Sequence, residues 1–317
     1  MLGRNGELKD ICGTTLFLAS DASAFITDQT IFLDEGYLKM IDSIEYQFSP
    51  RLAVPDFENY LQEENRLSAL TRSERPCLLD IAYGDTPRSR LDLFPATQDN
   101  LPTMVFVHGG YWRGRAKDEF SFVANAIDPR LANVIVLGFE LCPAVTVADI
   151  VRQIRQGLLW IKANATQYAL RGDRLALCGQ SAGAHLIAAL LAPANAEDRL
   201  PPELVTYACL VSGIYDLAPV PQITVNQDIR LKPEEVHALS PMRHPLQTRV
   251  PIDIVVGGLE TPSWIAQSAD LYRTLKEQGV TCHYHERPGL NHFSILMDLR
   301  GPGDYTAQLV KQGLAHA

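Results

Sequence analysis

An α/β fold with a mostly parallel central sheet, covered by helices on both faces, is predicted by three features of this 317-residue sequence. Short, almost wholly apolar runs recur along the chain, as expected for strands buried on both faces. These runs alternate with segments of helical periodicity, and right-handed crossovers convert that order into a parallel sheet. Chains of this length with such alternation commonly form one catalytic domain. The apolar runs are residues 104–107, 175–178, 207–211 and 254–258, and residues 281–286 form a further strand-like segment.

Two segments carry clear helix signals. Residues 147–161 place apolar side chains three and four positions apart, which gives a helix one buried face. Thr146 precedes this segment and Asp149 follows three residues later, as in a capping box at a helix start. Residues 264–278 form a second such helix, and Gly279 stands where a C-cap is expected. Both segments fit the alternation of strands and helices.

A G-x-S-x-G motif occupies residues 179–183, directly after one apolar run and before the helical segment 184–191. A strand, a sharp turn and a helix in this order form a nucleophile elbow, which exposes the serine hydroxyl above the sheet. We therefore predict Ser181 as a nucleophile. The backbone N–H of the next residue, Ala182, is then expected to donate to the oxyanion formed during attack.

A second motif, H-G-G-Y-W at residues 108–112, follows the first apolar run. Paired glycines after a buried strand let backbone amides approach a substrate oxygen without a Cβ in the way. Loops of this type supply oxyanion donors in lipases and esterases, so Gly109 and Gly110 are predicted to complete an oxyanion hole. Tyr111 and Trp112 are expected either to form an aryl-binding wall or to pack in the core beneath the loop.

A nucleophilic serine in such an elbow needs an acid and a base later in the chain, in the order Ser, Asp or Glu, His. His292 is the predicted base, because it lies in a loop just past the last predicted strand, where an α/β sheet holds its chemistry. Glu260 is the predicted acid, since it follows the last strand but one. Asp216, which follows the strand before that, is the alternative.

Together these residues predict acyl transfer through a covalent intermediate. His292 accepts the proton of Ser181 as the serine attacks a carbonyl carbon, while Glu260 stabilises the imidazolium. An acyl-serine forms, the amine or alcohol leaves, and water releases the acid.

These motifs resemble those of the serine-dependent kynurenine formamidases and related carboxylesterases of the α/β-hydrolase superfamily. The resemblance rests on H-G-G-Y-W, G-Q-S-A-G-A-H and a late G-x-N-H-F, and it spans about residues 45–317. It implies an α/β-hydrolase fold with the triad Ser181, Glu260 and His292. It also implies a small cap after strand 6, for which the proline-rich, irregular residues 216–251 are the candidate. The family more usually has Asp at the acid position, and Glu reaches one methylene further.

Residues 1–40 show a different pattern. A helix at about residues 8–19 and a strand at about 29–33 resemble the C-terminal tail of short-chain dehydrogenases. The chain has no Gly-rich dinucleotide-binding turn after a first strand, so no oxidoreductase activity is expected. We interpret the segment as a remnant of a fused or frameshifted dehydrogenase. Its apolar helix is expected to dock on the hydrolase-like domain or to join a partner chain, which allows a homo-oligomer.

Composition and charge indicate which binding partners, cellular compartment and cofactors are expected. The formal net charge is −9 and no basic run occurs, which argues against nucleic-acid binding. No apolar stretch reaches the length of a membrane span, and the N-terminus lacks signal-peptide features. Six cysteines are scattered without C-x-x-C spacing, which favours buried free thiols in a reducing cytoplasm. No cluster of His, Cys and Asp in the sequence has the spacing of metal ligands, and the predicted mechanism uses neither a metal nor a cofactor.

Three functions are compatible with the sequence. The first is an arylformamidase acting on N-formylkynurenine or a similar aryl formamide. The second is a catabolic carboxylesterase or amidase with another substrate, and the third is a non-catalytic scaffold that assembles through the N-terminal helix. The complete set of Ser181, Glu260 and His292 argues against the scaffold. Either enzyme would have a small-molecule ester or amide as its partner.

Overall fold

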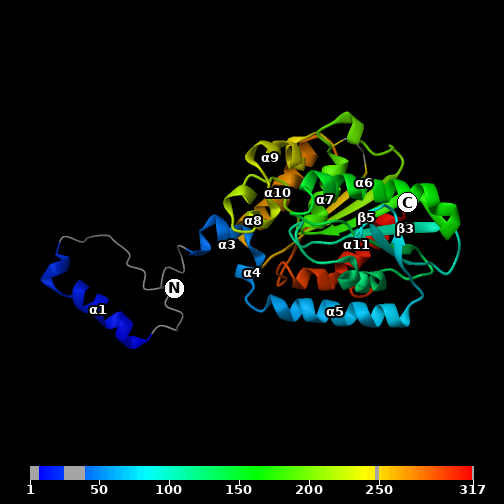
Figure 1. Ribbon diagram of the computed structural model, residues 1–317. Helices are drawn as coiled ribbons and strands as arrows, with labels where there is room; N and C mark the ends of the chain where they lie inside the picture. The colour runs from blue at the N-terminus through cyan, green and yellow to red at the C-terminus, as the bar shows by residue number, and fades with distance from the viewer. Residues whose placement is uncertain (1–6, 25–39, 247–249, 316–317) are drawn as a thin grey trace.

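The computed structural model describes residues 7–24, 40–246 and 250–315 (Figure 1). Within them, eight strands form one sheet in the order β1-β2-β4-β3-β5-β6-β7-β8. β2 is antiparallel to both of its neighbours, and all the other neighbours pair in parallel. The predicted mostly parallel sheet is confirmed. The strands are β1 (Leu78–Ala82), β2 (Arg90–Phe94), β3 (Leu101–Val107), β4 (Asn133–Leu137), β5 (Leu170–Gln180), β6 (Val205–Val211), β7 (Ile252–Gly257) and β8 (Cys282–Arg287).

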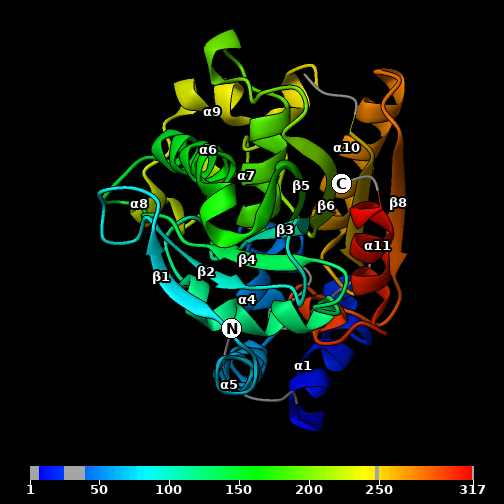
Figure 2. The ribbon, with the colours of Figure 1, turned by 90° about the vertical axis from the view of Figure 1, so that its right-hand side faces the viewer.

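Helices cover both faces of this sheet (Figure 2). One face is packed by α6 (Val147–Asn164), α7 (Ala182–Leu191) and α10 (Pro262–Glu277). The other is packed by α11 (Tyr305–Leu314) and two 3₁₀ segments, η2 (Lys117–Ala126) and η7 (Ser294–Leu299), and α5 (Phe57–Glu74) packs on η2. In the part of the chain that the structure describes, the remaining α-helices are α1 (Leu8–Leu18), α3 (Ile44–Phe48), α4 (Pro50–Ala53), α8 (Asn226–Ile229) and α9 (Pro233–Leu239).

The central strand β3 shows why its sequence is apolar throughout. Val105 and Val107 belong to the core beneath α6 and α7, while Met104 and Phe106 belong to the core on the η2 side. All four side chains are fully buried. Because a parallel strand is covered on both faces, both alternating sets of side chains are apolar.

The predicted helix signals are confirmed with small shifts of boundary. The Thr146 hydroxyl accepts a hydrogen bond from the Asp149 N–H, and the Asp149 carboxylate accepts one from the Thr146 N–H, which closes the capping box of α6. α10 begins slightly earlier than predicted, because Pro262 fits the first turn of a helix. Gly279 follows its end with a φ of 74°, a conformation that glycine adopts without strain.

The segment between β6 and β7 forms the expected small cap. It contains the short helices α8 and α9 joined by irregular backbone. This arrangement agrees with its proline content, because proline favours turns and helix first turns over long regular elements. The cap places α8 along the pocket of the site described below.

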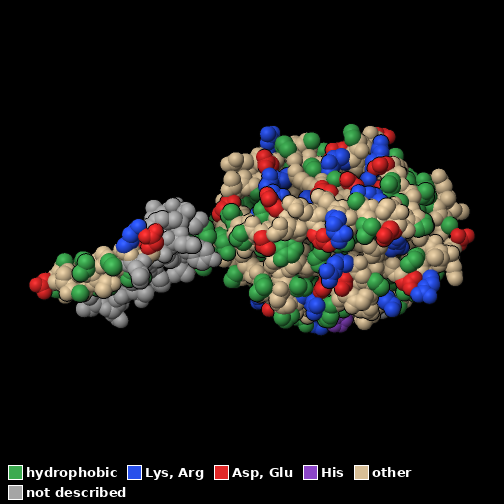
Figure 3. All heavy atoms as spheres, turned by 90° about the horizontal axis from the view of Figure 1, so that it is seen from below, with side chains coloured by type: hydrophobic (Ala, Val, Ile, Leu, Met, Phe, Trp, Pro, Cys, Tyr) green, Lys and Arg blue, Asp and Glu red, His purple; other side chains and the backbone are tan. Residues whose placement is uncertain are grey.

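The N-terminal helix predicted at residues 8–19 is present as α1, whereas the predicted strand at residues 29–33 lies outside the described residues. Large apolar side chains remain exposed on α1, and Figure 3 shows hydrophobic atoms along it. These side chains are Ile11, Leu16, Phe17 and Leu18. Among the described residues, none of the helices combines the length and apolar character needed to cross a membrane.

Candidate active site

Ser181 lies at the turn between β5 and α7, with φ 56° and ψ −120°. A positive φ is unfavourable for a residue with a Cβ, so the surrounding backbone must hold this conformation. A Cβ on Gly183 would lie 1.9 Å from the Val107 carbonyl oxygen, and one on Gly179 would lie 2.7 Å from the Gly183 backbone. The two glycines of the motif therefore provide the space that the sharp turn needs.

The structure brings Ser181, His292 and Glu260 together at the carboxyl ends of β5, β7 and β8. His292 Nε2 lies 3.1 Å from Ser181 Oγ, and His292 Nδ1 lies 2.7 Å from Glu260 Oε2. An Nδ1–H donating to the carboxylate leaves Nε2 free to accept the serine proton. All three residues are buried. This hydrogen-bonded line can activate a serine for attack on a carbonyl carbon.

Asp216, the alternative acid, lies elsewhere. Its carboxylate accepts hydrogen bonds from Arg243 Nη2 at 3.0 and 2.9 Å. It also accepts one from the Ala218 N–H at 3.0 Å, the local pattern of an Asp in a turn. The geometry thus places Glu260, and not Asp216, beside His292.

Glu260 is itself held by donors that the sequence did not point out. Its Oε1 accepts hydrogen bonds from the Ser212 hydroxyl at 2.5 Å and from the Gly257 N–H at 2.8 Å. Trp264 Nε1 donates to the Ser212 carbonyl oxygen at 2.8 Å, and its ring packs edge-on against His292. A position directly after β6, next to the strand that carries the acid, was the available signal for Ser212.

The predicted oxyanion donors lie on two segments next to Ser181, the start of α7 and the H-G-G loop. Ala182 is the first residue of α7, where backbone N–H groups have no partner within the helix. A Cβ on Gly109 would lie 3.1 Å from the Ser181 Cβ, which shows how closely the H-G-G loop approaches the serine. Gly110 has a φ of 116°, and a Cβ there would lie 2.2 Å from the Gly114 carbonyl oxygen. A side chain at Gly110 would therefore be strained, and a Cβ at Gly109 would require the Gln180 side chain to move.

His108 supports this loop from below. Its ring is stacked between Phe120 and Phe139, with centroid distances of 5.3 and 4.2 Å. Burial lowers the pKa of His108 to about 3, so the ring is neutral at physiological pH. Its Nδ1–H donates to the Gly109 carbonyl oxygen at 2.7 Å, which orients the adjoining peptide group.

Tyr111 and Trp112 have different environments. Tyr111 lines the pocket, and its hydroxyl donates to the Phe48 carbonyl oxygen at 2.7 Å. Trp112 is buried, and its Nε1–H donates to His185 Nδ1 at 3.1 Å. The aryl-wall prediction is therefore wrong for Trp112, because the indole needs a buried hydrogen-bond partner and finds it beneath the loop, away from the pocket.

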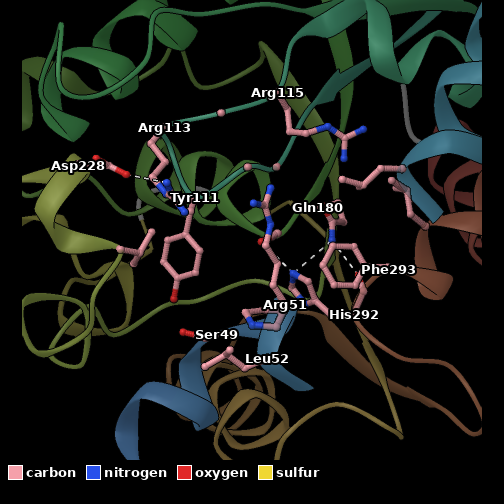
Figure 4. Close-up of a pocket in the computed structure, with 18 of the residues that line it drawn as sticks. Ser49, Arg51, Leu52, Tyr111, Arg113, Arg115, Gln180, Asp228, His292 and Phe293 are labelled. Atoms are coloured by element: carbon pink, nitrogen blue, oxygen red, sulfur yellow. Dashed lines mark hydrogen bonds and ion pairs between the residues drawn. The ribbon is translucent and has the colours of Figure 1, made fainter. Parts of the chain in front are cut away.

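A pocket of about 720 Å³ opens beside Ser181 (Figure 4). The H-G-G loop, α4 and α8 of the cap all contribute to its walls. Its lining includes the apolar side chains Leu52, Leu61, Tyr111, Phe120, Val225, Phe293 and Leu296 and the charged side chains Glu45, Arg51, Glu64, Arg113, Arg115 and Asp228. Within the described residues, no cluster of His, Cys, Asp and Glu could hold a metal ion.

The sheet order and a serine on a strand–turn–helix, followed by an acid and a histidine on later loops, define an α/β-hydrolase. The BD-FAE family profile matches residues 91–275. The chain is 30% identical to the kynurenine formamidase of Danio rerio over 271 residues, which cover 81% of this chain and 91% of that protein. It is 29% identical to the kynurenine formamidase of Salmo salar, covering 83% of this chain and 92% of that protein.

Esterase B from Lactobacillus rhamnosis has a similar fold, with a TM-score of 0.65 at 16% identity over 83% of this chain and 93% of that one. The chain belongs to the BD-FAE family of α/β-hydrolases. It is therefore a hydrolase acting on small amides or esters. The predicted fold class and enzyme class are both confirmed.

Proposed function

We propose that this chain is a serine-dependent arylformamidase that forms an acyl-serine at Ser181. The observation that carries the proposal is the continuous hydrogen-bonded line from Glu260 through His292 to Ser181. Two kynurenine formamidases that match nearly their whole length to this chain support the formamide as substrate.

The catalytic sequence follows from the site. His292 Nε2 takes the proton of Ser181 as Oγ attacks the formyl carbon, and the carboxylate of Glu260 stabilises the imidazolium. The N–H groups of Ala182, Gly109 and Gly110 bind the oxyanion, and removing one such donor typically costs about 3 kcal/mol. His292 then protonates the departing aryl amine. Water, activated by the same histidine, releases formate and restores the serine.

The pocket supports an aryl leaving group. Its volume of about 720 Å³ is in the range of sites that enclose small organic molecules. The aromatic rings of Tyr111, Phe120 and Phe293 line it and offer flat faces for an aryl ring. Tyr111 directly follows Gly110, and its ring lines the same pocket as Ser181.

A substrate panel tests this proposal. N-formylkynurenine, formanilide, p-nitrophenyl acetate and p-nitrophenyl butyrate would be compared by kcat/KM, with formate release measured for the formamides. We expect the highest value for an aryl formamide, and no turnover by Ser181→Ala. An enzyme that hydrolyses the esters but neither formamide would instead be a carboxylesterase, the alternative that the fold of esterase B favours.

We further propose that residues 45–317 form the catalytic domain and that residues 1–40 are a dehydrogenase-like remnant with a role in self-association. Every proposed catalytic residue lies within residues 45–317. The exposed apolar side chains of α1 suit a contact with another chain. The buried free thiols of Cys142, Cys178, Cys209 and Cys282 suit a reducing cytoplasm.

A further inference from the structure

Three arginine side chains line the pocket, and two of them are neutralised by the protein. Arg115 contacts Glu64 at 2.6 Å and Glu119 at 2.5 Å. Arg113 contacts Asp228 at 2.6 Å, a pair drawn as a dashed line in Figure 4. The guanidinium groups of Arg113 and Arg115 therefore have carboxylate partners before any substrate binds.

The third arginine, Arg51, is different. Among residues 7–24, 40–246 and 250–315, no carboxylate lies within ion-pair distance of it and no hydrogen bond to it is found. Within these described residues, the Arg51 guanidinium makes one cation–π contact, with the face of the Phe57 ring at 5.0 Å from the ring centroid. Figure 4 shows its side chain extending from α4 into the middle of the pocket, between Tyr111 and His292. An unpaired, solvent-accessible guanidinium thus points toward the space a substrate would occupy.

The charged side chains around Arg51 favour an anionic ligand over a cationic ligand beside its guanidinium. Burial and the positive charges of Arg113 and Arg115 lower the pKa of Arg51, and Glu58 only partly opposes them. Glu45 also lines the pocket, but its two carboxylate oxygens accept hydrogen bonds from the Ser49 hydroxyl and the Thr224 N–H. Arginine remains charged in proteins at any physiological pH.

We propose that Arg51 binds a carboxylate of the substrate. The enzyme therefore prefers small amides or esters that carry a carboxylate away from the reacting carbonyl. The planar guanidinium offers parallel N–H donors that match a carboxylate in a bidentate pair. The neighbouring aromatic side chains Tyr111 and Phe293 would hold the ring that carries this carboxylate. The inference rests on the proposed function for the chemistry at Ser181, and it adds the charge of the substrate and the residue that selects it.

The test compares substrates that differ only by a carboxylate. Formanilide is paired with 2-, 3- and 4-formamidobenzoate, and kcat/KM is measured per active site titrated with a fluorophosphonate. We expect the wild-type enzyme to favour at least one formamidobenzoate over formanilide. Arg51→Gln should reduce that preference by about 10- to 100-fold, the usual value of a hydrogen-bonded charge pair. Arg51→Lys should retain part of it.

Arg66→Gln is the matched control, because Arg66 is exposed on α5 and pairs with Glu63 outside the pocket. It should leave the preference unchanged. An Arg51→Gln enzyme with the wild-type preference, or a wild-type enzyme that prefers formanilide to every formamidobenzoate, would overturn the inference. Added NaCl should weaken the wild-type preference and have little effect on that of Arg51→Gln.

A second pair of compounds separates this inference from the proposed function. Phenyl acetate and the three acetoxybenzoates carry the same difference in charge on an ester. If the formamides are not cleaved but the esters show an Arg51-dependent preference for the anion, the arylformamidase proposal fails and the inference stands. If the formamides are cleaved without regard to charge, the inference fails and the function stands.

Discussion

Replacing Glu260 with Gln tests the proposed acid through the hydrogen bonds that fix it. Glu260 Oε1 accepts from two donors, the Ser212 hydroxyl and the Gly257 N–H. The carbonyl oxygen of Gln will therefore take the Oε1 position, and its NH₂ group will face His292 Nδ1. A donor there forces Nδ1 to accept, so the imidazole proton moves to Nε2, where it blocks acceptance of the serine proton. The imidazolium also loses its negative partner.

Both effects act on the transition state, and the loss of the correct tautomer in such triads costs about 10⁴-fold in turnover. We therefore expect Glu260→Gln to lower kcat by about 10³- to 10⁴-fold, or about 4–5.5 kcal/mol. The assay is steady-state hydrolysis of the best substrate in the panel, with circular dichroism to confirm folding. Asp216→Asn is the control and should cost less than about tenfold, because its partner is Arg243. A Glu260→Gln enzyme with a tenth of wild-type turnover, or a larger loss in Asp216→Asn, would refute the assignment.

Three further outcomes are expected. Ser181→Ala should lower turnover by about 10⁶-fold without changing the midpoint of thermal unfolding, and a variant retaining a tenth of the activity would exclude this nucleophile. Deleting residues 1–40 should spare kcat/KM and change the oligomeric state in size-exclusion chromatography with light scattering; a folded but inactive product would contradict the remnant hypothesis. Asp253 on β7 accepts hydrogen bonds from Tyr207 at 2.6 Å and from His285 at 2.8 Å. Burial raises its pKa, but these bonds and the nearby histidines outweigh burial and hold the pKa below its ordinary value. Its contribution to stability is therefore present above about pH 4 and is lost as the pH falls through the folded-state pKa. Asp253→Asn should show a shallower loss of Tm on acidification in calorimetry, and parallel curves for the two proteins would count against this.

The parts of the fold that sequence reasoning predicted are those set by local patterns. The strand β3 is apolar at every position because both of its faces are covered, and the turn at Ser181 is marked by glycines that its backbone requires. The chain order of acid and base follows from the order of the strands. This is why the structure brings Glu260 and His292 to Ser181, although their catalytic roles remain a proposal.

The parts that were not predicted depend on packing between distant segments. Arg51 reaches the pocket because α3 lies against α10 and α4 packs on α3. The Gln47 carbonyl oxygen of α3 accepts a hydrogen bond from the Thr261 hydroxyl at 2.6 Å. These short helices have too few residues for a periodic pattern. Trp112 presented a similar difficulty, since an aromatic residue after a glycine pair can turn toward substrate or core, and its partner His185 decides the direction.

The wide sequence separation within the site has a consequence for how the protein becomes active during synthesis. Ser181 and His292 are 111 residues apart, and the contact between Gln47 and Thr261 spans 214 residues. A nascent chain therefore carries no activated serine until most of it has been translated and β8 has joined the edge of the sheet. Reactivity of Ser181 toward a fluorophosphonate then reports completion of folding. This reactivity could be used to follow the kinetics of folding on the ribosome or after dilution from denaturant.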